Sequence, residues 1–240
     1  MQTPNTADFW LLKQLNHGMA SSYFFTKQAI LFNNLNLLEL IMAAVLVYWW
    51  FSKDSKTSST VNLRHRVLLV LLSCLPTYVV ARISQSIFHR PRPLINMPLE
   101  IPPIFQAQFK EMREAFTGFG SFPSDHAGLF FLFTTIVFTV NKRLGIFCLL
   151  VSLYYCALRV AVGYHWPSDI LGGAVLGSLV ALLMLSLEPR LNKILKNFVS
   201  QAERYPGIIY TVSFLFLCDF SQSFTNLKIL ADALGKRVFH

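Results

Sequence analysis

Long runs of apolar residues recur along the chain and are separated by short polar segments. A helix needs about 20 predominantly apolar residues to cross the hydrocarbon core of a bilayer. The runs that approach this length are residues 35–51, 67–88, 127–140, 144–162, 170–187 and, more weakly, 208–220. The pattern therefore predicts an all-α fold, a polytopic transmembrane helical bundle of five or six spans.

Two segments outside these runs have the pattern of surface helices. Residues 1–34 contain apolar positions, at 8–15 and 23–32, typical of an amphipathic interfacial helix, and residues 1–16 lack the features of a cleavable signal peptide. In the long connection at residues 89–122, prolines 91, 93, 98, 102 and 103 prevent a continuous helix. Within it, a short helix on the bilayer surface is predicted by the spacing of Phe105, Phe109, Met112 and Phe116. Gly118 and Gly120 then allow a hinge.

The composition agrees with a membrane protein and excludes other classes. Of the 240 residues, 54% are hydrophobic and 14% are charged, whereas about a quarter of a soluble domain is charged. The net charge is +9, but the basic residues form short clusters without interleaved aromatics, so we expect no nucleic-acid partner. We expect one domain over residues 1–240, with a motif core at 82–169 and a C-terminal segment, 188–240, whose topology the pattern leaves open.

The distribution of basic residues predicts the orientation in the membrane. Counting spans places the connections at residues 89–122 and 161–168 on the same side. The opposite side carries the basic excess, namely Lys53, Lys56, Arg64, Arg66, Lys142, Arg143, Arg190, Lys193, Lys196 and Arg204. Because such an excess marks the cytoplasm, the long connection is predicted to face outward.

Three polar motifs fall on this predicted outer side. The first is R-P-R-P at residues 90–93, the second is P-S-D-H at 123–126, and the third is R-x5-H-x3-D from Arg159 through His165 to Asp169. Arginines and a serine at a helix start bind phosphate, and two histidines supply a nucleophile and a proton donor near neutral pH. No thiolate or carboxylate cluster demands a metal, so we expect no metal and no cofactor.

The order and spacing of these motifs resemble the three-part signature of the type 2 phosphatidic acid phosphatase superfamily of membrane lipid phosphatases. The resemblance covers residues 85–169, about a third of the chain. The P-S-D-H form of the second motif, where many members have glycine before the histidine, resembles the bacterial undecaprenyl-diphosphate phosphatase branch.

The resemblance implies a role for each motif residue. His165 would attack phosphorus to give a phosphohistidine, Asp169 would orient and charge its ring, and His126 would protonate the leaving oxygen. Arg92, Arg159 and Ser124 would hold the non-bridging oxygens. The family works without a metal.

Two departures from the family pattern concern the cation set. The family usually has a lysine seven residues before the motif arginine, where this chain has Gln85. Because Arg82 lies one turn before Gln85 on the same helical face, we propose that Arg82 reaches the phosphate; undiminished turnover of Arg82→Ala would contradict this. A serine commonly precedes the third-motif arginine, and here Leu158 replaces it.

Several of these residues also have structural interpretations. Ser124 and Asp169 stand where helix-capping residues occur, and Asp125 suits a helix start or a contact to arginine as well as catalysis. Arg90 is either a substrate contact or a headgroup anchor. The Gly173 and Gly177 pair is typical of close helix packing within a bundle.

We therefore expect an enzyme that hydrolyses undecaprenyl diphosphate to the monophosphate at the outer face of a bacterial inner membrane. Phosphatidic acid or phosphatidylglycerol phosphate is an alternative substrate, and transfer to another lipid is an alternative reaction. A protein of another class, a transporter or a non-enzymatic binder of anionic lipids, also uses arginines in this way. The expected partners are an isoprenoid or glycerolipid phosphate and membrane lipids, and the oligomeric state is left open.

Overall fold

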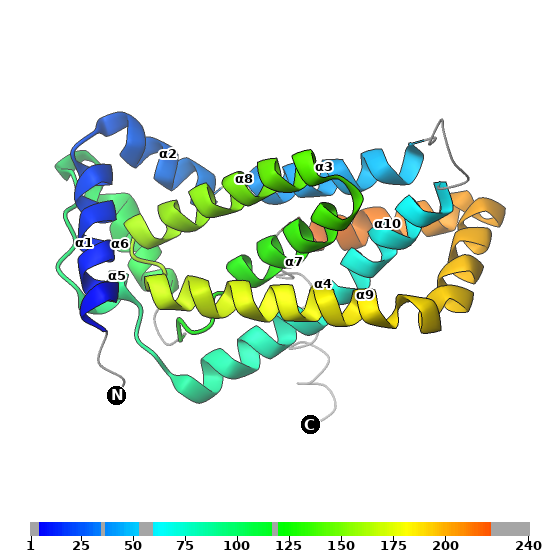
Figure 1. Ribbon diagram of the computed structural model, residues 1–240. Coiled ribbons are helices and arrows are strands. Elements are labelled where there is room, and N and C mark those ends of the chain that lie inside the picture. Colours follow the sequence, from blue (N-terminus) through cyan, green and yellow to red (C-terminus); the bar gives the residue numbers. More distant parts are fainter. Residues whose placement is uncertain (1–4, 35–36, 53–59, 117–119, 222–240) are drawn as a thin grey trace, which may run out of the picture. The chain divides into compact units, whose positions relative to one another are not determined.

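The computed structural model describes residues 5–34, 37–52, 60–116 and 120–221. Regular structure in these ranges is entirely helical, which confirms the predicted all-α fold (Figure 1). The elements are α1 Thr6–Ala20, α2 Tyr23–Asn34, α3 Leu37–Phe51, α4 Thr60–Phe88, α5 Pro93–Asn96, a 3-10 turn Pro103–Phe105, α6 Gln106–Ala115, α7 Asp125–Val140, α8 Lys142–Ala161, α9 Pro167–Arg204 and α10 Pro206–Ser221. The predicted hinge residue Gly118 and the basic residues Lys53 and Lys56 lie outside the described residues.

The helices account for the predicted spans. Three segments of the described chain are long and apolar enough to cross a bilayer, namely Leu63–Asn96, Lys142–Ala161 and Pro167–Arg204. Shorter apolar helices occupy Glu39–Phe51, Asp125–Val140 and Pro206–Phe216, at the remaining predicted positions. The protein is an integral membrane helical bundle.

One helix is longer than its apolar run predicted. The run at residues 170–187 is only part of α9, which continues through Pro189 to Arg204. The charged extension remains helical because it carries its own buried stripe, Leu195, Val199 and Ala202, at helical spacing.

The chain packs as two compact units. Residues Met1–Leu35 and Leu69–Ser186 form the first unit, and Asn36–Leu68 with Leu187–His240 form the second. All candidate site residues, from Arg82 to Asp169, belong to the first unit. Within it α7 packs against α8, and α1 and α2 both pack against α8. The single domain over residues 1–240 stays a prediction.

The helix predicted in the long connection is present, and its apolar stripe has a partner within the protein. Phe105, Phe109 and Met112 are buried in one cluster with Leu94 of α5 and Tyr164. The spacing thus predicted the helix correctly, and its apolar stripe packs against the protein. The position of this helix at the bilayer surface stays a prediction. Residues 106–115 carry their polar side chains on the opposite, exposed face.

The N-terminal segment forms two helices. α1 and α2 are separated at Ser21 and Ser22, and both have exposed aromatic side chains such as Trp10 and Phe24. The buried face of α1 includes two polar residues, Asp8 and Asn16. The placement of residues 1–34 at the membrane interface stays a prediction.

The glycine pair on α9 lies at a close helix contact, as its spacing predicted. A methyl group at Gly177 would overlap the backbone of Gly128 on α7. Gly177→Ala is expected to destabilise the protein by roughly 1–3 kcal/mol, because neither backbone can retreat without repacking the bundle. Thermal unfolding in detergent measures this, and Gly207→Ala is the control because a Cβ at Gly207 meets no atom within 4 Å. Equal melting temperatures for the two variants would contradict the close contact.

Candidate functional site

Arg92 lies at the centre of the three motifs. It is the N-cap residue of α5, directly after the turn that ends α4. Its Nη1 donates to the Tyr164 carbonyl at 2.9 Å, and its Nη2 donates to the Gly120 carbonyl at 3.0 Å. The side chain is only 1% exposed, and neither of these acceptors is a carboxylate. A buried guanidinium held by neutral carbonyls keeps its charge for an anionic ligand.

His165 stands beside this guanidinium in the turn between α8 and α9. Gly163 makes the turn possible because its φ of 81° lies in the left-handed region that side chains disfavour. The Nδ1 atom of His165 is 2.9 Å from the carbonyl oxygen of Ser121. Because a carbonyl oxygen only accepts, Nδ1 carries the proton and Nε2 carries the lone pair. Nε2 lies 3.5 Å from Arg92 Nη1, so the ring nitrogen with the lone pair and the buried guanidinium are neighbours.

Burial and neighbouring cations keep this imidazole neutral. Complete burial is the largest cause that lowers the pKa of His165 well below its ordinary 6.5, followed by the charges of Arg92 and Arg159. The carboxylate of Asp125 acts in the opposite direction but does not offset them. A neutral imidazole has the lone pair that nucleophilic attack requires.

Asp169 contacts His165 less directly than the family resemblance implies. Its Oδ2 is 3.9 Å from His165 Nδ1, and the same oxygen accepts a hydrogen bond from the backbone N–H of Trp166 at 2.7 Å. Trp166 precedes the first residue of α9, so Asp169 caps this helix, the structural role that its position also allowed. The hydrogen bond to the His165 ring comes from the Ser121 carbonyl. The catalytic role of Asp169 stays a prediction.

Arg90 is held between two carboxylates. Its Nη1 is 2.6 Å from Asp169 Oδ1, and its Nη2 is 2.7 Å from Asp8 Oδ2. The side chain is 8% exposed. Because these partners compensate its charge, the geometry favours a positioning role over either a substrate contact or a headgroup anchor.

The second motif pairs a carboxylate with a histidine at the start of α7. Ser124 is the N-cap residue, and its Oγ accepts from the N–H of Ala127 at 3.4 Å. His126 Nδ1 lies 2.9 Å from Asp125 Oδ1, which fixes the ring so that Nε2 is the atom available for proton transfer. Asp125 and His126 both lie close enough to His165 to change its electrostatic environment. Asp125 therefore contacts both a histidine and an arginine, and its role in catalysis stays a prediction.

That arginine is Arg82, the residue proposed to replace the family lysine. Arg82 Nη2 is 3.4 Å from Asp125 Oδ2, and its Nη1 donates to Gln85 Oε1 at 3.2 Å. Gln85 is buried and donates from Nε2 to the Pro123 carbonyl at 2.8 Å. Gln85 thus ties α4 to the second motif, while the Arg82 side chain remains 34% exposed beside it. The phosphate contacts of both residues stay predictions.

Arg159 completes the cation set from α8. Its Nη1 donates to Tyr155 Oη at 3.0 Å and to Asn33 Oδ1 at 3.3 Å. The rings of Tyr155 and Tyr164 flank the guanidinium, with centroids 5.4 and 5.2 Å from Cζ. These contacts are to neutral groups, so Arg159 adds positive charge to the same buried region as Arg92.

Several residues at the site were not found from the sequence, among them Tyr155, Tyr164 and Ser168, which contact the site arginines. Asp8 and Asn33 come from the N-terminal helices and contact Arg90 and Arg159. A carboxylate on the apolar face of residues 8–15 was the only signal for Asp8. Ser121 acts through its backbone carbonyl, which no side-chain pattern reveals.

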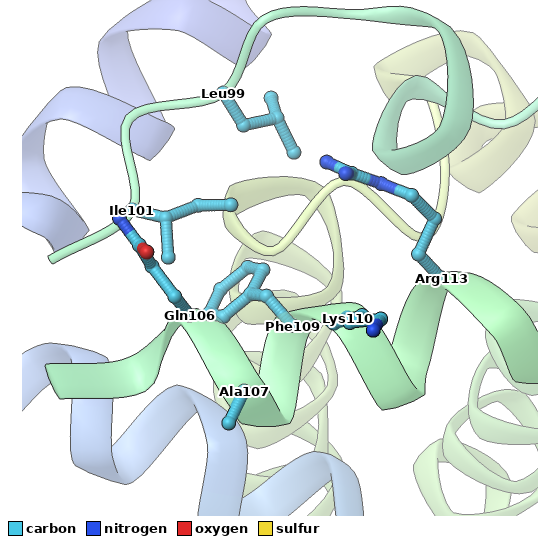
Figure 2. A pocket seen from close by; sticks show the side chains of 7 residues that line it. All are labelled: Leu99, Ile101, Gln106, Ala107, Phe109, Lys110 and Arg113. Atoms are coloured by element: carbon cyan, nitrogen blue, oxygen red, sulfur yellow. The ribbon is translucent and has the colours of Figure 1, made fainter. Parts of the chain in front are cut away.

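A separate cavity of about 470 Å³ lies between α6 and the preceding loop (Figure 2). In Figure 2, Arg113 extends from α6 toward Leu99 across this cavity. The lining residues are Leu99, Ile101, Gln106, Ala107, Phe109, Lys110 and Arg113, none of which belongs to the three motifs. Among the described residues, no group of three or more His, Cys, Asp or Glu side chains is placed to hold a metal ion.

A helical membrane bundle with buried arginines around a neutral histidine defines the class of protein: an integral membrane protein with a site suited to an anionic group. The chain belongs to the PAP2 superfamily, whose family model matches residues 66–193, more than half of its length. A curated relative, the bacitracin transport permease protein BcrC of Bacillus licheniformis, is 26% identical over 151 residues. This match covers 63% of the chain and 66% of the relative, slightly less than two thirds. No solved structure gives a significant match to the chain.

The low pKa of His165 predicts the pH dependence of catalysis. The predicted attack by His165 requires a neutral ring, so activity is expected to persist as the pH falls through 6.5 and to be lost only at lower pH, where the ring gains a proton. The measurement is kcat/KM against pH for a lipid diphosphate and a lipid monophosphate. A fall in kcat/KM at low pH that is caused by protonation of the enzyme is expected at the same pH for both substrates. A common limb at or above pH 6.5 would contradict a buried, neutral His165.

Proposed function

We propose that this protein is a metal-independent phosphatase that hydrolyses undecaprenyl diphosphate to undecaprenyl phosphate through a phosphohistidine at the outer face of the membrane. The observation that carries the mechanism is the His165 ring, with its Nδ1 proton directed to Ser121 and its Nε2 lone pair beside Arg92. The substrate is proposed because the P-S-D-H motif resembles that of the undecaprenyl-diphosphate phosphatase branch.

The residues support a two-step transfer. In the first step His165 Nε2 attacks the terminal phosphorus, the bond from phosphorus to the bridging oxygen breaks, and His126 gives its proton to that oxygen. In the second step water attacks the phosphohistidine, His126 takes a proton from the water, and the phosphorus–nitrogen bond breaks to release inorganic phosphate. Arg92, Arg159 and Arg82 stabilise the negative charge of the equatorial oxygens in both steps. His126 returns to its starting protonation state at the end.

Transport is the second candidate, because the name of the Bacillus licheniformis relative describes a transport permease. A transporter of an anionic ligand needs the arginines but has no need of a histidine lone pair or of an Asp125–His126 pair. Those two features favour phosphoryl transfer over simple anion binding.

The test is phosphate release by purified protein in detergent with chelator present. Undecaprenyl diphosphate and phosphatidic acid are supplied in parallel, and His165→Ala serves as the blank. Faster His165-dependent release from undecaprenyl diphosphate supports the proposal. Preference for phosphatidic acid would keep the mechanism and change the substrate, dependence on metal would contradict the metal-free mechanism, and no release from either lipid would favour transport or binding.

The outward orientation is also a proposal, supported by the basic residues at the opposite ends of the spans. Glu111 lies on the exposed face of α6, so Glu111→Cys is expected to react with a membrane-impermeant maleimide added outside intact cells. Cys74, Cys148 and Cys156 are buried, and the partly exposed Cys218 is replaced by serine so that the background stays low. Labelling only after the membrane is opened would contradict the outward orientation and place α6 on the cytoplasmic side.

A further inference from the structure

We propose that Asp8, on the N-terminal helix α1, is a positioning residue for phosphoryl transfer: it holds Arg90 and the first turn of α9 in place beside His165. This inference rests on the proposed function. Asp8 lies far outside residues 66–193, the part of the chain that matches the family. The site therefore depends on a residue that the family motifs do not contain.

Asp8 contacts two residues, Arg90 and Ser168 in the first turn of α9. Its Oδ2 accepts from Arg90 Nη2 at 2.7 Å and from Ser168 Oγ at 2.6 Å, and its Oδ1 accepts from the backbone N–H of Ser168 at 2.8 Å. Both oxygens of the carboxylate are used, and the residue is 5% exposed. Such a buried carboxylate is stable only with this complete set of donors.

Arg90 passes this constraint to Asp169. The guanidinium joins the two carboxylates, because Nη2 faces Asp8 while Nη1 donates to Asp169 Oδ1 at 2.6 Å. Asp169 then caps α9 through the N–H of Trp166, the residue that follows the nucleophile His165. Asp8 thus acts on the position of His165 through Arg90 and the helix start, and touches neither the substrate nor the reacting atoms.

The rest of α1 is built to hold Asp8 at this position. Leu12, one turn further along, packs in a buried cluster with Val160, Trp166 and Ile170. After another turn Asn16 donates from Nδ2 to the Ala161 carbonyl at 3.0 Å and accepts at Oδ1 from the N–H of Glu100 at 2.8 Å. Three successive turns of α1 are therefore fixed on the elements that carry the third motif.

The charge balance predicts the effect of changing Asp8. Asp8→Asn keeps the shape but removes the charge that fixes Arg90 against Asp169. We expect kcat to fall on the order of 10- to 100-fold with KM changed less than about twofold, because small displacements of a reacting group have effects of this size on the chemical step. Asp8→Glu, which keeps the charge, is expected to recover part of the loss.

The matched control breaks a different contact of the same helix. His17 Nδ1 on α1 is 2.8 Å from Glu100 Oε2, and both side chains are more than half exposed. Glu100→Gln changes this contact without touching Arg90, so it is expected to leave kcat unchanged. Thermal unfolding of each variant shows that the chain is folded. If Asp8→Asn does not fold, Ser168→Ala removes the hydroxyl that donates to Asp8 at 2.6 Å and accepts from Arg90 Nη1 at 2.7 Å, keeps both charges, and is expected to lower kcat several-fold.

A double-variant cycle separates positioning from a general loss of structure. In an Arg90→Gln background, Asp8 is a buried carboxylate near Asp169 without its cation, so Asp8→Asn should then have no further cost or should restore some activity. Equal losses in the two backgrounds, or an unchanged kcat for Asp8→Asn beside an active wild type, would overturn the positioning role alone. Absence of His165-dependent phosphate release from the wild type would overturn the proposed function and this inference with it.

Discussion

His165→Ala is expected to lower kcat by on the order of 10⁴-fold or more, because removing a covalent nucleophile leaves only the residual catalysis that binding and charge stabilisation provide. The Nε2 atom of His165 lies beside Arg92, and its Nδ1 proton is fixed by the Ser121 carbonyl. A water molecule bound in its place would have neither the lone-pair alignment nor the leaving-group chemistry of the two-step reaction. The measurement is single-turnover phosphate release in detergent.

The same variant tests the covalent intermediate. Wild-type protein mixed with a lipid diphosphate carrying a labelled terminal phosphate and quenched in alkali is expected to retain label on the polypeptide, and the bond should break in acid as phosphoramidates do. His165→Ala should retain none. His17→Ala is the matched control, since His17 is exposed and contacts only Glu100 among the described side chains near it. Label that persists in His165→Ala would assign the nucleophile to another residue.

The second large effect is expected for Asp125→Asn. Asp125 fixes His126 through the 2.9 Å contact to Nδ1 and also faces Arg82 at 3.4 Å. An amide at this position can donate to Nδ1, which selects the wrong tautomer of His126 and removes the charge that stabilises its protonated ring. We expect kcat to fall by roughly 10²- to 10⁴-fold, since an equivalent change in a Ser-His-Asp triad lowers kcat by about 10⁴-fold.

Helix capping is the competing interpretation of Asp125, and a cap elsewhere provides the control. Asn141 caps α8 by accepting from the N–H of Leu144 at 3.0 Å, at the end of α7 far along the helix from the motif residues. Asn141→Ala is expected to cost about 1 kcal/mol of stability without lowering kcat. If Asp125→Asn changed only the melting temperature in the same way, its role would be structural. If Asp125 acts through His126, the loss of kcat in Asp125→Asn should also be smaller with substrates whose leaving group needs no proton.

Local chemistry explains why part of the fold was predictable. Runs such as residues 144–162 are apolar all round, and the bilayer requires every backbone group there to bond within its own segment, so helices followed directly. The end of α9 and the placement of α6 were not predictable in this way. Whether a stripe such as Phe105, Phe109 and Met112 meets lipid or protein depends on what packs against it, which the spacing does not encode.

For the candidate site too, some features could be predicted from the sequence and others could not. The sequence by itself determined which chemical groups are candidates, namely Arg92, Arg159, His126 and His165, because the proposed phosphoryl transfer needs these residue types at helix ends. Only the tertiary structure decided how they are used: Asp169 caps α9, Ser121 orients His165, Asp125 pairs with His126, and Asp8 from a distant helix holds Arg90. Hydrogen-bond partners are selected by distances of a few tenths of an ångström between elements far apart in the chain, and a linear pattern of residue types carries no such distances.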